Sequence, residues 1–149
     1  MSLMSVFDIS GSAMSAQTVR LNTTASNMAN ANSAAASPDQ VYRSRQPIFA
    51  TIQAEMLNSN NADAFNFDGG DGVGRGVQIL GIVESDAPFQ QRYEPEHPMA
   101  DQEGYVYYPN VNIVEEMTNM ISSSRSFQMN VDVMDAARTM MQRVMSLGQ

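Results

Sequence analysis

The sequence predicts an α+β protein in which long N- and C-terminal helices pair as a coiled coil, with a small β-rich middle domain between them. Apolar residues recur at heptad spacing near both ends of the 149-residue chain, a pattern typical of coiled-coil helices. Most of the glycines and prolines fall between these ends, among short runs rich in β-branched and aromatic residues. We therefore divide the chain into residues 1–37, 38–109 and 110–149.

The first segment predicts a helix from about Val6 to Ala31. Every seventh position carries a larger apolar side chain, namely Phe7, Met14, Leu21 and Met28. The alternate seam positions carry the small residues Gly11, Thr18 and Ala25. This stripe predicts a helix that approaches a neighbour closely. The helix is predicted to end in the stretch NANSAAASP, residues 30–38. Asparagine and serine favour caps and turns, and Pro38 cannot continue a helix.

The middle segment predicts a few antiparallel strands joined by long turns. Its β-leaning runs are PIFATIQAEM, GVQILGIVES and FQQRYEP. Residues 58–76 are polar and rich in glycine, which predicts a flexible loop.

The last segment predicts a second helix that ends near Leu147. Its stripe alternates steps of four and three and consists of Ile113, Met117, Met120, Ser124, Phe127, Val131, Met134, Arg138, Met141 and Met145. At about 1.5 Å per residue the helix would span roughly 50 Å, which is too long to fold back on a small domain. Asn110 or Asn112 is the expected N-cap. Tyr108, Pro109 and Asn110 form the expected junction, because proline fixes its own φ and extends the residue before it.

Composition excludes several classes of function. The chain has a net charge of −8, and its arginines are scattered singly, so it lacks the clustered cations that bind nucleic acid. It contains no lysine and no cysteine, which excludes Schiff-base chemistry, thiolate catalysis and disulfides. No apolar run is long enough for a secretory signal or a membrane span. If the protein leaves the cytoplasm, we expect it to do so without a cleaved signal.

Three local patterns could suggest chemistry. His97 lies among acidic residues, residues 68–76 resemble a calcium or phosphate loop, and Ser122, Ser123 and Ser124 precede Arg125. A single histidine beside prolines is more often structural, and the glycine-rich loop lacks the ligand order of an EF-hand. The serines have no accompanying base. We therefore expect no enzymatic activity, catalytic residue, metal site or cofactor.

The two stripes could simply pair with each other in a helical hairpin. Between residues 2 and 37, however, Asp8 and Arg20 are the only charged residues, so this helix is suited to being surrounded by protein. We therefore predict an assembly interface made of Phe7, Met14, Leu21, Ala25, Asn27, Met28, Asn30, Ile113, Met117, Met120, Phe127, Val131, Met134 and Met141.

Two stretches carry a resemblance to a known family. Residues 10–33 resemble the N-terminal signature of bacterial flagellar axial proteins, whose Leu-x-x-x-Ala-x-Asn-x-Ala-Asn-x-Asn pattern is matched by Leu21, Ala25, Asn27, Ala29, Asn30 and Asn32. Residues 76–141 are similar to proximal-rod subunits of the flagellar basal body. The matching positions include Tyr93, Pro95, His97, Pro98, Ala100 and Asp101. In the connector that follows the first helix, Tyr42 and Arg43 are expected to keep an anchoring role.

The resemblance implies a structural subunit of the proximal rod. Its terminal helices would pair as a coiled coil that lines a tubular drive shaft around the export channel. It implies type III export and a place in the periplasm-spanning rod. The implied partners are copies of the chain, other rod subunits, distal rod proteins and the adaptor at the export gate and MS ring. The alternative is a soluble oligomeric adaptor or export chaperone with a small β insert.

Overall fold

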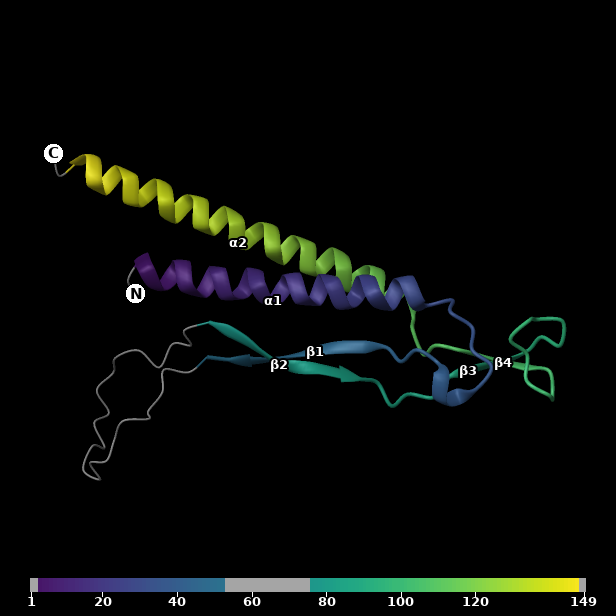
Figure 1. Cartoon of the computed structure of the whole chain (residues 1–149). Coiled ribbons are helices and arrows are strands. Elements are labelled where there is room, and N and C mark those ends of the chain that lie inside the picture. Colours follow the sequence, from purple (N-terminus) through teal and green to yellow (C-terminus); the bar gives the residue numbers. More distant parts are fainter. Residues whose placement is uncertain (1–2, 53–75, 148–149) are drawn as a thin grey trace, which may run out of the picture.

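The fold was analysed in a computed structural model that describes residues 3–52 and 76–147. In chain order it contains α1 (Leu3–Asn30), a short 3₁₀ helix η1 (Pro38–Gln40), β1 (Arg45–Thr51), β2 (Val77–Glu84), β3 (Gln90–Tyr93), β4 (Tyr105–Tyr108) and α2 (Ile113–Leu147) (Figure 1). The predicted α+β class, with paired terminal helices and a small β-rich middle region, is confirmed. All of the predicted loop 58–76 except Gly76 lies outside the described residues.

Helix α1 occupies the middle layer of the molecule. Helix α2 packs on one side of α1, and strands β1 and β2 lie on the other (Figure 1). The deepest positions of α1 hold small or polar side chains, which are Ser10, Ala16, Thr23, Thr24 and Asn27. Small side chains suit this position, because a helix with neighbours on two sides must let both approach closely.

Strands β1 and β2 form an antiparallel pair that runs from Arg45 opposite Glu84 to Thr51 opposite Val77. The register shifts between Ile48 and Phe49, which produces an irregularity of the kind that bends and twists a strand. Ser12 of α1 secures the far end of this pair, because its Oγ accepts a hydrogen bond from the Val77 backbone N–H at 3.1 Å.

Strands β3 and β4 form a second antiparallel pair, which lies beyond the C-terminal end of α1 and the start of α2 (Figure 1). The turn between them is closed by Asp101, whose Oδ1 accepts backbone N–H groups of Glu103 at 2.9 Å and Tyr105 at 2.8 Å. Tyr93 and Tyr105 meet edge to face across the pair. The connector, which comprises residues 31–44 between α1 and β1, also joins this sheet. Ala35 of the connector and Tyr107 of β4 exchange backbone hydrogen bonds.

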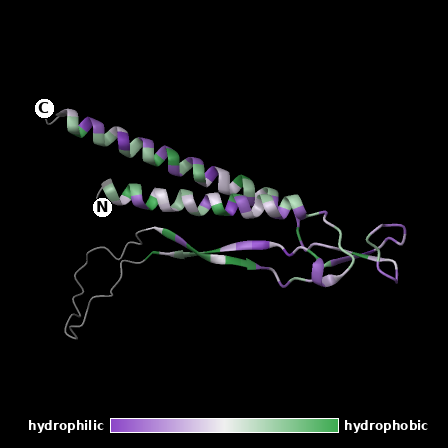
Figure 2. Ribbon diagram, viewed as in Figure 1, coloured by the Kyte–Doolittle hydropathy of each residue, from purple (hydrophilic) through white to green (hydrophobic). Residues whose placement is uncertain are grey.

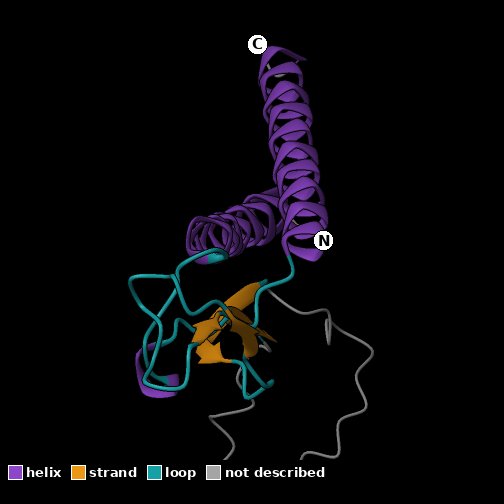
Figure 3. Ribbon diagram, turned by 90° about the vertical axis from the view of Figure 1, so that its right-hand side faces the viewer, coloured by secondary structure: helices purple, strands orange, loops and turns teal. Residues whose placement is uncertain are grey.

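Helix α2 begins at Ile113 because Asn112 caps it. The Asn112 Oδ1 accepts the backbone N–H of Val114 at 3.1 Å, which selects one of the two predicted caps. From this root α2 runs antiparallel to α1 and gradually leaves it, so the C-terminal part of α2 stands clear of the strands (Figures 1 and 3). Apolar residues continue along the whole of α2, including its outer side (Figure 2).

Candidate assembly interface

A buried polar junction fixes how the helices meet the strands, and Asn27 is at its centre. The Asn27 side chain is 1% exposed. Its Nδ2 donates hydrogen bonds to Glu116 Oε1 at 2.9 Å and to the Arg45 carbonyl at 2.8 Å. Its Oδ1 accepts hydrogen bonds from the Tyr42 hydroxyl at 2.8 Å and the Arg45 N–H at 2.9 Å. One amide therefore joins α1, the connector, β1 and α2.

Asn110 extends this junction to the second sheet. Its Oδ1 accepts the Ser44 backbone N–H at 2.9 Å, and its Nδ2 donates to the carbonyls of Ala87 at 2.9 Å and Ser85 at 3.3 Å. Pro109 beside it is among the most deeply buried side chains. The predicted junction residues thus lie where β4, the connector and the start of α2 come together.

Tyr42 and Arg43 both anchor the connector. Tyr42 contacts α1 through Asn27, and its hydroxyl also lies 3.2 Å from the Ser26 hydroxyl. Arg43 lies over the Phe89 ring and 3.5 Å from an Asp86 carboxylate oxygen. The connector is therefore attached to α1 by Tyr42 and to the segment between β2 and β3 by Arg43.

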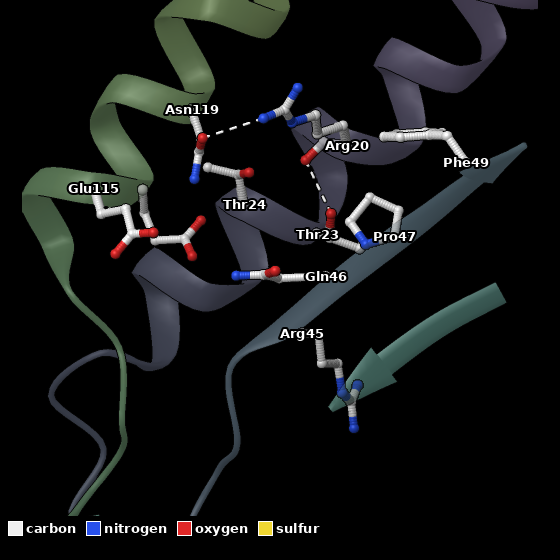
Figure 4. Close-up of a pocket in the computed structure, with 10 residues that line it drawn as sticks. Arg20, Thr23, Thr24, Arg45, Gln46, Pro47, Phe49, Glu115 and Asn119 are labelled. Carbon is white, nitrogen blue, oxygen red and sulfur yellow. Dashed lines mark hydrogen bonds between the residues drawn. The ribbon is translucent and has the colours of Figure 1, made fainter. Parts of the chain in front are cut away.

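A pocket of about 310 Å³ opens beside the junction, between α1, β1 and the root of α2 (Figure 4). Across it, Arg20 Nη2 donates a hydrogen bond to Asn119 Oδ1 at 3.2 Å. The Arg45 side chain points away from α1 towards β2 (Figure 4), where it pairs with Glu84 at 3.0 Å. The pocket lining also includes Glu115 and Glu116 at the start of α2.

The predicted interface residues of α1 differ in how far they are buried inside the chain. Phe7, Met14, Leu21, Met28 and Asn30 are half-buried, and Ala25 is exposed. Asn27 is the exception, since its whole amide is used inside the chain. The Asn30 Nδ2 donates to the Ser26 carbonyl at 2.8 Å, so this side chain stabilises the end of its own helix.

The predicted interface residues of α2 also divide. Met120, Phe127, Val131, Met134 and Met141 are half-buried, on the side of the helix that faces α1, whereas Ile113 and Met117 are exposed. The buried face also contains Glu116, Ser123 and Ala137, which the heptad pattern did not include. Contacts of any of these residues with other subunits stay a prediction.

Two tyrosines near the junction have perturbed acidity. Loss of water contact raises the pKa of Tyr108, and its hydrogen bond to Glu94 Oε2 at 3.1 Å raises the pKa further. Loss of water contact also raises the pKa of Tyr107, together with the nearby charge of Asp101. Tyr108 lines a hollow with Val111 and Val114, where the second sheet meets the start of α2.

Two of the local patterns that could suggest chemistry lie within the described residues, whereas all of residues 68–76 except Gly76 lies outside them. His97 Nδ1 accepts the backbone N–H of Met99 at 3.1 Å, so the imidazole closes a turn. Within residues 3–52 and 76–147, no group of three histidine, cysteine, aspartate or glutamate side chains is placed to hold a metal. Ser123 is fully buried against α1, and no helix in the described ranges is long and apolar enough to cross a membrane.

Sequence reasoning missed Ser44 and Glu116 as members of the junction. No local signal could have found these residues, because they reach Asn27 from positions 17 and 89 residues away in the chain.

Comparison with known proteins agrees with this architecture. The family model described as "Flagella basal body rod protein" matches residues 7–34, within α1 and the connector. The model described as "Flagellar basal body rod FlgEFG protein C-terminal" matches residues 102–147, which include β4 and α2.

Full-length relatives are more specific. The flagellar basal-body rod protein FlgC of Salmonella typhimurium is 42% identical over 149 residues, which cover both chains completely. FlgC of Yersinia enterocolitica is 41% identical with the same coverage. FlgC of Borreliella burgdorferi is 32% identical over 154 residues, covering all of this chain and 99% of the relative. The chain therefore belongs to the FlgC family of flagellar basal-body rod proteins.

Proposed function

We propose that this protein is a structural subunit of the bacterial flagellar basal-body rod and that it functions by assembly. The observation that carries the proposal is the match over the whole chain to relatives named as rod proteins. The architecture supports it, because the two terminal segments that match rod-family models are also the two helices that pack together.

At a finer level, we propose a place in the proximal rod, where the terminal helices surround the export channel and the strands lie outside. The partners would be other rod subunits, copies of the chain, distal rod proteins and the adaptor at the export gate and MS ring. The long exposed apolar surface of α2 supports such contacts, because a stripe of this length fits a surface that other proteins cover.

Removal of residues 1–30 tests the proposal in a strain that lacks the native copy. We expect the truncated chain to be absent from purified basal bodies and the cells to be non-motile, because α1 is the middle layer of the subunit. The full-length chain and the exposed-site variant Asn22→Ala, introduced in the same way, should restore swimming.

An adaptor or export chaperone would behave differently. It would remain in the soluble fraction of cells that swim, and it would not be found in purified basal bodies. Recovery of the full-length chain only in that fraction would overturn the rod proposal.

A further inference from the structure

The single histidine of the chain, His97, determines the course of the turn between β3 and β4, which comprises residues 94–104. Its backbone N–H donates to the Glu94 carbonyl at 3.0 Å, and its own carbonyl accepts the Ala100 N–H at 2.9 Å. Its side-chain Nδ1 accepts the Met99 N–H at 3.1 Å. One residue therefore takes part in three hydrogen bonds of the turn, and the third of them depends on the imidazole.

The shape of this turn depends on hydrogen bonds, because little of the turn is packed. Within residues 94–103 no side chain is buried. Figure 1 shows the turn at the end of the molecule opposite the chain termini. Pro95 and Pro98 have no N–H to donate, so few backbone donors remain to close the turn. Apolar contacts therefore do not compensate for the loss of an acceptor there.

The side-chain hydrogen bond depends on the protonation state of the imidazole. A neutral imidazole has one nitrogen without a proton, and the contact with Met99 identifies this nitrogen of His97 as Nδ1. In an imidazolium both nitrogens carry protons, so Nδ1 would present an N–H to the N–H of Met99. The bond can therefore form above the pH at which His97 takes up a proton, and it is lost below that pH.

The charged neighbours of His97 do not replace this bond. The turn and its two strands carry the carboxylates Glu94, Glu96, Asp101 and Glu103, the guanidinium of Arg92 and the phenols Tyr93, Tyr105, Tyr107 and Tyr108. Within residues 3–52 and 76–147, no carboxylate forms an ion pair with the imidazole. Asp101 instead accepts two backbone N–H groups, and Glu94 accepts the Tyr108 hydroxyl. The acidic turn attracts an imidazolium whether it is closed or open, so its charge does not favour the closed form.

We propose that His97 makes the β3–β4 turn sensitive to protons. At neutral pH the imidazole accepts the Met99 N–H and the turn is closed. In mild acid the imidazolium releases this N–H and residues 97–100 gain freedom, while the Asp101 contacts and the paired strands stay in place. The shape of this end of the molecule and its negative charge therefore change together. The property goes beyond the proposed function and does not depend on assembly.

Exchange of the Met99 amide with water, measured by NMR on the full-length chain, tests the proposal. At each pH the rate is divided by the rate in an unstructured peptide of the same sequence, which removes the intrinsic effect of pH on exchange. Protection of Met99 should fall about fivefold between about pH 7.5 and about pH 5.5, because imidazole changes its charge in this range and one exposed hydrogen bond is lost. The Tyr105 amide, which donates to Asp101, is the internal reference and should keep its protection.

Two substitutions separate the effect of the imidazole from that of the rest of the turn. His97→Asn is the matched control, because an asparagine side chain accepts the N–H two residues on and does not titrate, so Met99 should stay protected at both pH values. His97→Ala removes the acceptor, so Met99 should be unprotected at both. Wild-type protection that does not change with pH, or an equal change in His97→Asn, would overturn the proposal. Neither result bears on the rod function, which recovery of the chain in basal bodies tests.

Discussion

At the scale of single residues, the buried side chain of Asn27 connects several segments of the chain through hydrogen bonds. Its amide satisfies a hydroxyl, a carboxylate and both backbone groups of Arg45. Buried polar groups are stable only while they are hydrogen-bonded, so the arrangement holds only if α1, β1 and α2 keep one relative position. The main contribution of Asn27 is therefore to fix the relative positions of α1, β1 and α2.

We predict that Asn27→Ala lowers the free energy of unfolding by roughly 3 kcal/mol, because buried Glu116 and the Arg45 N–H lose their partner. Asn27→Asp should be at least as damaging, since it brings a carboxylate next to that of Glu116. Urea unfolding followed by circular dichroism measures both effects. The control is Asn22→Ala, on an exposed position of the same helix. Equal stability of Asn27→Ala and the control would show that the junction carries no net energy.

At the scale of elements, the sequence predicted which segments are helical, but it did not predict which positions of each helix are most deeply buried. Periodicity identified both helices and the β-rich middle because it is a local property. In α1 the larger apolar residues of the stripe, such as Leu21 and Met28, are only half-buried. Contacts on two sides of the helix bury Thr23 and Asn27 more deeply. In α2 the stripe was placed slightly off the face that meets α1, since Glu116 and Ser123 are buried despite being polar.

The β3–β4 element depends on a backbone conformation that only glycine adopts easily. Gly104 has φ of 83°, and a Cβ built there would lie 2.9 Å from Tyr93 Cε2 and 3.2 Å from Pro95 Cβ. We predict that Gly104→Ala destabilises this element by about 1–2 kcal/mol. Hydrogen exchange of the Tyr93 and Tyr105 amides should detect faster opening.

Gly81→Ala is the matched control for this prediction. Gly81 lies in β2, and a Cβ there would have no atom within 4 Å. Exchange in the β3–β4 element should be unchanged in this variant. Equal exchange rates in Gly104→Ala and Gly81→Ala would mean that the turn relaxes without cost.

At the scale of the whole molecule, the described residues join the second sheet, β3–β4, to the helices mainly at the junction, whereas the β1–β2 pair also contacts α1 at its far end through Ser12. Between β4 and α2 the chain passes through Pro109, which is buried, and then Asn110, which is anchored to the connector and to the segment after β2. A force applied to β3 and β4 would reach α2 through Pro109 and Asn110. The stiffness of the link between the β3–β4 pair and α2 therefore depends on a few residues at the junction.

We predict that Pro109→Gly loosens the angle between the strands and α2 while the β3–β4 element stays folded. The substitution removes a fixed φ and frees Tyr108 from the extended conformation that proline favours in the preceding residue. The Tyr108 hydroxyl still reaches Glu94, and Asn110 still binds Ser44, so the flanking anchors remain. The expected result is normal export into the medium with rods that assemble poorly or break under load.

Motility in medium of increasing viscosity measures this effect, because load on the rod rises with drag. Pro98→Gly is the matched control, since Pro98 is exposed in the β3–β4 turn and lies on no path between the sheets and the helices. Pro109→Gly cells should lose swimming at a lower viscosity than Pro98→Gly cells. If both variants swim like the wild type at high viscosity, the junction only connects the two parts, and stiffness must come from contacts between subunits.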